Sequence, residues 1–142
     1  MPDHPTHVGH VHLKVRDLDR SLAFYTDVLG LDVTERVDRF AFLSWGDRHH
    51  DVALQELGPD ADGPGRGVGL YHAAFEVPDA DSFRTVHDRL QEAGVVVSPV
   101  DHRISEALYF SDPDGNGLEV YRDTRAENDR PLWRGENRRL DL

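Results

Sequence analysis

Two histidines and one glutamate occupy positions from which they can ligate a metal ion. His10 and His72 each lie in a run of residues that alternates in polarity like a strand. Glu119 lies between Leu118 and Val120, where a carboxylate is costly to bury unless it is paired or ligated. Two imidazoles and one carboxylate suit Fe(II) or Mn(II) and leave coordination positions for substrate and oxygen. These residue types predict a metal site; ordinary strand histidines and a solvated glutamate are the alternative.

An internal repeat relates the two histidines. His10 and His72 are 62 residues apart, and the helix signals that follow each of them keep this offset. The offset grows to 64 later in each half, which predicts Gln55 as the counterpart of Glu119. Because Gln55 is not a carboxylate, three ligands are the expected number. His12 shares the predicted strand face of His10 and is the alternative ligand, or a packing residue beside it.

Three more side chains are candidates for proton transfer or substrate contact. His50 follows His49 at the start of a predicted strand, and an imidazole that titrates near neutrality can take up a proton and return it. A solvent-exposed loop histidine is the alternative for both. Tyr109, across a predicted hairpin from Glu119, either offers its hydroxyl to a substrate or packs as an edge aromatic. His102 either closes over the site or caps a loop.

The predicted elements divide the chain into two βαβββ modules. A lead-in is expected at 1–7, the first module at 8–57, a glycine-rich linker at 58–69, the second module at 70–123 and a C-terminal arm at 124–142. Within the modules, period-two runs and helix caps predict strands at 8–15, 31–37, 40–45, 52–57, 70–77, 95–97, 108–110 and 118–121, and helices from Asp17 to Gly30 and from Asp79 or Asp81 to Gly94.

Composition limits the partners. The chain has 142 residues, no cysteine and a net charge of −11, so thiol nucleophiles and zinc-thiolate sites are excluded, and nucleic acid or an anionic membrane is not expected as a partner. No apolar run reaches the roughly 20 residues that span a bilayer, and the N-terminus lacks a signal-peptide pattern. We therefore expect a soluble, cytoplasmic protein.

Several motifs resemble those of the vicinal oxygen chelate superfamily, which includes glyoxalase I, bleomycin-resistance proteins and type I extradiol dioxygenases. The motifs that indicate the superfamily are Gly9-His10, Val15-Arg16-Asp17-Leu18, Ser21-Leu22-Ala23-Phe24-Tyr25 and Asp112-Pro113-Asp114-Gly115-Asn116 before Glu119. Those that resemble the metal-bearing module of catechol 2,3-dioxygenases are Arg48-His49-His50-Asp51-Val52-Ala53-Leu54, Tyr71-His72, Asp101-His102 and Ser105-Glu106-Ala107-Leu108-Tyr109-Phe110. The resemblance covers residues 8–123.

The resemblance implies an α+β vicinal oxygen chelate fold whose two modules line a metal cleft. It implies His10, His72 and Glu119 as ligands of Fe(II), or of Mn(II), and His50 as the acid–base histidine. It also implies that Tyr109 and His102 contact a catecholate. The implied activity is cleavage of a catechol-type ring with O2.

Two other functions compete with this interpretation. A glyoxalase-type isomerase or thiol transferase of the same fold would use the same three ligands, but Gln55 and the presence of His50 count against it. A metal-free binding or resistance protein would not need all three ligands. The fold resemblance and the extended arm also lead us to expect a homodimer.

Overall fold

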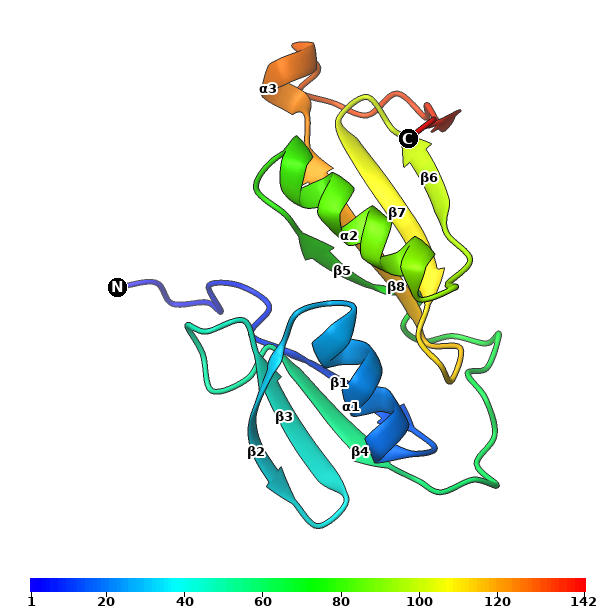
Figure 1. Ribbon diagram of the computed structural model, residues 1–142. Coiled ribbons are helices and arrows are strands. Elements are labelled where there is room, and N and C mark those ends of the chain that lie inside the picture. The colour runs from blue at the N-terminus through cyan, green and yellow to red at the C-terminus, as the bar shows by residue number, and fades with distance from the viewer. The chain divides into compact units, whose positions relative to one another are not determined.

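The computed structural model describes all 142 residues, and the chain forms two compact units, Met1–Pro64 and Gly65–Leu142. The boundary falls inside the glycine-rich stretch 58–69. Each unit contains a helix and its own sheet, so the predicted α+β class with two βαβββ repeats is confirmed (Figure 1). No helix combines the length and the apolar character needed to span a bilayer.

The first unit is a four-stranded sheet with one helix against it (Figure 1). Its strands run in the spatial order β1-β4-β3-β2, with β1 parallel to β4 and the other pairs antiparallel. The elements are β1 (Val11–Val15), α1 (Leu18–Asp27), β2 (Asp32–Val37), β3 (Phe40–Ser44) and β4 (Val52–Glu56). Leu13, Val15, Leu18 and Tyr25 are buried between helix and sheet, which follows the predicted apolar faces.

The second unit repeats this arrangement and extends it. Its sheet has the order β5-β8-β7-β6-β9, and α2 packs against β8. The elements are β5 (Ala73–Glu76), α2 (Ala80–Glu92), β6 (Ser98–Asp101), β7 (Ser105–Ser111), β8 (Gly117–Asp123), α3 (Arg125–Asn128) and β9 (Arg138–Arg139). Phe83, Leu90, Leu108 and Leu118 form the centre of its core. The short elements α3 and β9 lie within residues 124–142.

Two strand predictions differ from the structure. The prediction of a strand at 95–97 is wrong. The strand is β6, Ser98–Asp101, which pairs with β7 on one side and with β9 on the other. The first strand of each unit also starts later than expected, at Val11 and at Ala73. As a result His10 and His72 each lie one residue before a strand, where the backbone is no longer confined to the sheet.

The N-cap of α2 provides a test of how a surface carboxylate contributes to stability. The Asp79 side chain accepts a hydrogen bond from the Ser82 backbone N–H at 2.8 Å, and this bond lowers the pKa of Asp79. A lowered folded-state pKa contributes stability above the unfolded value, and that stability is lost as pH falls through the folded value. We expect Asp79→Asn, which keeps the cap but does not titrate, to show a smaller fall in Tm between about pH 6 and about pH 2.5 than the wild-type chain. Equal slopes in thermal unfolding would contradict this.

Candidate active site

His72 and Glu119 form the centre of the candidate site in the second unit. His72 Nε2 lies 2.9 Å from Glu119 Oε1, and their side chains are 28% and 12% exposed. Glu119 is on β8, where its neighbours Leu118 and Val120 are buried on the other face. A largely buried carboxylate is stable only with such a partner or with a metal ion. The predicted proximity of these two side chains is therefore present in the structure.

A glycine allows the chain before β5 to approach β8. A Cβ atom on Gly117 would lie 2.7 Å from the backbone oxygen of Tyr71, closer than carbon and oxygen approach in proteins. Gly117 begins β8, and Tyr71 immediately precedes His72. The close approach of the two backbones brings His72 beside the strand that carries Glu119. Any larger residue at 117 would push these two side chains apart.

Tyr109 and His102 extend the site along the same sheet. Tyr109 lies directly opposite Glu119 in the β7–β8 pair, and its ring contacts His72 with a centroid distance of 5.7 Å. The Tyr109 hydroxyl is 2.7 Å from His102 Nε2. Burial, followed by the negative charge of Glu119 and a hydrogen bond to its carboxylate, raises the pKa of Tyr109 to about 12, so the phenol keeps its proton at neutral pH. The second unit thus brings together four of the predicted site residues.

His10 and His50 lie together in the first unit. Their ring centroids are 4.4 Å apart, and His50 also contacts Phe42 at 5.0 Å. Burial lowers the pKa of His50, and the neighbouring His10 and His49 lower it further. A neutral imidazole at physiological pH is a proton acceptor, as the predicted acid–base role requires. His12 is exposed on β1 and faces the edge of Phe40 instead.

A chain of polar contacts orients His50. His49 Nε2 is 3.0 Å from the Glu35 carboxylate, and His49 Nδ1 is 3.0 Å from His50 Nδ1. Because a carboxylate only accepts, a neutral His49 carries its hydrogen on Nε2 and offers Nδ1 as an acceptor. His50 then donates from Nδ1, and its Nε2 lone pair is the basic atom. Sequence reasoning did not identify Glu35, since its contact with His49 depends on a β-bulge between Val33 and Glu35.

The strand register corrects one predicted correspondence between the two units. His12 and Ala74 are equivalent at the offset of 62, and they lie opposite Ala53 and Glu119 respectively. The counterpart of Glu119 is therefore Ala53, and the prediction of Gln55 was wrong. Phe42 pairs with Ala53 and Tyr109 pairs with Glu119, so the second unit has already gained residues before β7, and the offset of 64 does not extend to these strands. Alanine cannot ligate a metal, so the first unit offers no last-strand ligand at this position.

The two sets of residues belong to different units. No group of three or more histidine, cysteine or carboxylate side chains in the structure is arranged to hold a metal ion. His72 and Glu119 are together in the second unit, and His10 is in the first unit beside His50. The predicted set of three metal ligands therefore stays a prediction.

Comparison with known proteins identifies the family. Residues 7–120 match the family described as the Glyoxalase/Bleomycin resistance protein/Dioxygenase superfamily. The chain is also similar to the solved structure of a glyoxylase/bleomycin resistance protein/dioxygenase domain from Frankia sp. EAN1pec, with 28% identity and a TM-score of 0.72. That similarity covers 84% of this chain and 99% of the Frankia chain.

Relatives with assigned activities differ in chemistry. A catechol-2,3-dioxygenase from Bacillus subtilis (strain 168) is 43% identical over 129 residues, which are 90% of this chain and 44% of that protein. The chain thus spans less than half the length of this relative. A glutathione transferase FosA from Serratia marcescens is 32% identical over 118 residues, which are 80% of this chain and 79% of that protein. The predicted fold family is confirmed, and the chain belongs to the glyoxalase/bleomycin resistance protein/dioxygenase superfamily.

Proposed function

We propose that the chain is an extradiol dioxygenase that cleaves a catechol-type ring with O2. The observation that carries the proposal is the His72–Glu119 pair at 2.9 Å, with Tyr109 directly opposite Glu119. The 43% identity to a catechol-2,3-dioxygenase supports this choice over other activities of the superfamily. In the proposal, His10 completes the metal site as the third ligand.

The donor set fits a divalent metal. An imidazole nitrogen and a carboxylate oxygen that lie within hydrogen-bonding distance, with little exposure, are ligand types that suit Fe(II) and Mn(II). Ala53 at the position equivalent to Glu119 limits the set to three protein ligands, because no fourth carboxylate or amide stands there. When bound, Fe(II), or alternatively Mn(II), supplies the Lewis-acid and redox chemistry that lets a catechol react with O2.

The protein side chains move and hold protons. His50 Nδ1 is engaged by His49, so Nε2 is the basic nitrogen of His50 and accepts a proton from one catechol hydroxyl. The lowered pKa of His50 favours the neutral imidazole that this step requires at neutral pH. Tyr109 and His102 contact the diol. One ring carbon–carbon bond beside the diol breaks, and both atoms of O2 enter the product, a ring-opened semialdehyde. The substrate supplies all the electrons, so no external reductant is needed.

The function is tested by reconstituting the protein with Fe(II) without air and then adding catechol and air. We expect a yellow ring-fission product to appear. Tight binding of Fe(II) without colour from catechol or substituted catechols would contradict the proposal and favour isomerase or transferase chemistry. Failure to bind Fe(II) or Mn(II) would instead indicate a metal-free binding protein.

The acid–base role of His50 predicts a separate result. We expect His50→Phe to lower kcat by roughly 10²- to 10⁴-fold, the usual contribution of a positioned proton-transfer group, while the amount of bound iron changes little. His4→Phe, in the exposed lead-in, is the matched control and should keep wild-type turnover. Full turnover in His50→Phe would remove the acid–base assignment and leave the metal site untouched.

Thiol transfer is the second candidate function. It is favoured by the 32% identity to a glutathione transferase FosA, which covers 79% of that protein. A transferase of this kind would need an electrophilic second substrate and would consume glutathione in the presence of a divalent metal. Loss of free thiol during incubation with glutathione and a small electrophile such as an epoxide would support it, and no loss alongside catechol cleavage would exclude it.

A further inference from the structure

The C-terminal arm, residues 124–142, folds back onto the sheet of the second unit. After α3 it turns at Asp129, where φ is +49°, and returns to pair with β6 as β9. Asn128 Nδ2 donates to the Arg103 backbone oxygen at 2.8 Å, and Arg138 lies opposite Asp101 in the sheet. These contacts fix the arm at both ends of the turn that contains His102.

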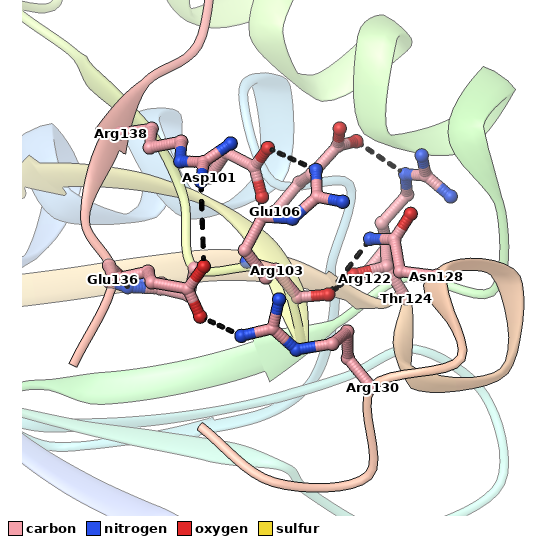
Figure 2. A network of polar contacts seen from close by, with 10 residues as sticks. Asp101, Arg103, Glu106, Arg122, Thr124, Asn128, Arg130, Glu136 and Arg138 are labelled. Atoms are coloured by element: carbon pink, nitrogen blue, oxygen red, sulfur yellow. Dashed lines mark hydrogen bonds and ion pairs between the residues drawn. The ribbon is translucent and has the colours of Figure 1, made fainter. Parts of the chain in front are cut away.

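Glu136 is the point at which the contacts of the arm meet. Its carboxylate accepts a hydrogen bond from Arg130 Nη2 and forms an ion pair with Arg138 at 3.6 Å, as Figure 2 shows. Its backbone oxygen accepts a hydrogen bond from Trp133 Nε1 at 2.8 Å and lies 3.2 Å from His102 Nδ1. The Trp133 ring also meets the His102 ring edge to face, with centroids 6.1 Å apart. The arm thus holds one carbonyl oxygen against one nitrogen of His102.

This contact decides which nitrogen of His102 carries hydrogen. A carbonyl oxygen only accepts hydrogen bonds, so His102 Nδ1 must be the protonated nitrogen. In the neutral ring Nε2 is then an acceptor, and the 2.7 Å contact needs the hydrogen of the Tyr109 hydroxyl, for which the Glu119 carboxylate is the competing acceptor. Without the arm, a neutral histidine can exchange between its two tautomers, and the direction of the hydrogen bond between Tyr109 and His102 would not be fixed.

We propose that the C-terminal arm is a positioning element that holds His102 in its Nδ1–H tautomer through the Glu136 carbonyl. The Tyr109 hydroxyl thereby donates to His102 in place of Glu119, and the Tyr109 oxygen offers its lone pairs as acceptors to a bound ligand. The identity of that ligand as a catechol rests on the proposed function. A catechol that has lost one proton and keeps one hydroxyl supplies the required donor, whereas a ring with no remaining hydroxyl does not.

The tautomer can be measured without any activity. We would label the histidines of the full chain with ¹⁵N and record two-bond ¹H–¹⁵N correlations at about pH 8.5, where histidines are neutral. The His102 signals are assigned by their absence in His102→Gln. We expect the Nδ1–H pattern for His102 in the wild-type chain. An Nε2–H pattern would overturn the proposal, whatever the enzyme does with catechol.

Variants of the arm test whether it causes the preference. Arg130→Gln with Arg138→Gln releases the Glu136 carboxylate, and Trp133→Phe keeps an aromatic ring beside His102 but removes the second donor to the carbonyl. We expect a mixture of tautomers in the double variant and a smaller change in Trp133→Phe. Arg139→Gln is the matched control, because Arg139 lies in the same strand but pairs with Asp141. An unchanged tautomer in the double variant, or the same change in the control, would overturn the role of the arm.

A kinetic measurement separates this role from a general loss of structure. The double variant should raise KM for catechol by roughly two- to tenfold, the effect of weakening one hydrogen bond, with a smaller change in kcat. Unchanged backbone amide signals from β7 and β8 would show that the sheet is intact. If the wild-type chain does not cleave catechol at all, the proposed function fails, while the ¹⁵N spectra still decide the position of the His102 hydrogen.

Discussion

Glu119→Gln is expected to abolish catechol cleavage and to release the bound metal. Glutamine has nearly the same size as glutamate, so the buried position on β8, beside Leu118 and Val120, stays filled. The lost property is the negative charge that pairs with His72 and that would bind Fe(II). A bound metal contributes several kcal/mol to catalysis, so we expect kcat/KM to fall by at least about a thousandfold.

The experiment requires metal content and turnover from the same sample. Iron is counted after reconstitution and desalting, and the yellow product is followed on addition of catechol and air. Glu76→Gln is the control, because Glu76 lies on the adjacent strand β5 and contacts the Tyr121 hydroxyl instead. A Glu119→Gln protein that holds iron and turns over like the wild type would show that Glu119 is not a ligand.

The parts of the fold that depend on local signals were predictable from the sequence. Asp17 and Asp79 are the N-caps of the two helices, and each side chain accepts a backbone hydrogen bond from the first turn. Gly30 and Gly94 end the same helices with φ of +75° and +73°, conformations that other residues rarely adopt. These features need only a few neighbouring residues, so their spacing in the sequence is sufficient to locate them.

Strand β6 shows where local signals fail. The valine-rich run 95–97 has the higher intrinsic strand preference, yet the strand is Ser98–Asp101 and includes Pro99. Proline is tolerated there because β9 pairs only with Val100 and Asp101, and Pro99 meets the arm through its carbonyl, which accepts a hydrogen bond from the Leu140 N–H at 3.3 Å. The position of β6 is set by pairing with β7 and with the distant arm, which a local pattern does not contain.

In the candidate site, too, the residues that depend on local signals were predictable, and the residues that depend on distant contacts were not. His72 and Glu119 were predicted to be close because turn residues and strand alternation place both of them on the second sheet, and the structure has them 2.9 Å apart. Glu35 and Glu136 were missed. The contact between Glu35 and His49 needs a bulged hairpin, and the Glu136 carbonyl carries no side-chain signature in the sequence. Sequence patterns therefore identified the chemical groups but not the residues that orient them.

Asp112→Ala is expected to cause a large loss of stability in the second unit. The Asp112 side chain is buried, and its Oδ1 accepts hydrogen bonds from the backbone N–H groups of Asp114 and Asn116, both at 2.9 Å. Its Oδ2 accepts a third from Asn116 Nδ2, also at 2.9 Å. Alanine leaves all three donors without this acceptor, and each unmet donor costs about 1–3 kcal/mol where water cannot replace it. Because the turn is partly open to solvent at Gly115, we expect about 3 kcal/mol in total.

Two further variants make this result specific. Asn at position 112 keeps an oxygen for the two backbone donors, so Asp112→Asn should cost only about 1 kcal/mol. Asp141→Ala removes an exposed carboxylate that pairs with Arg139, and a surface pair of this kind is worth roughly 0–1 kcal/mol. Amide hydrogen exchange in β7 and β8 reports the second unit separately from the first. Equal protection in Asp112→Ala and Asp141→Ala would mean that the strands, and not the turn between them, determine the stability of the hairpin that carries Tyr109 and Glu119.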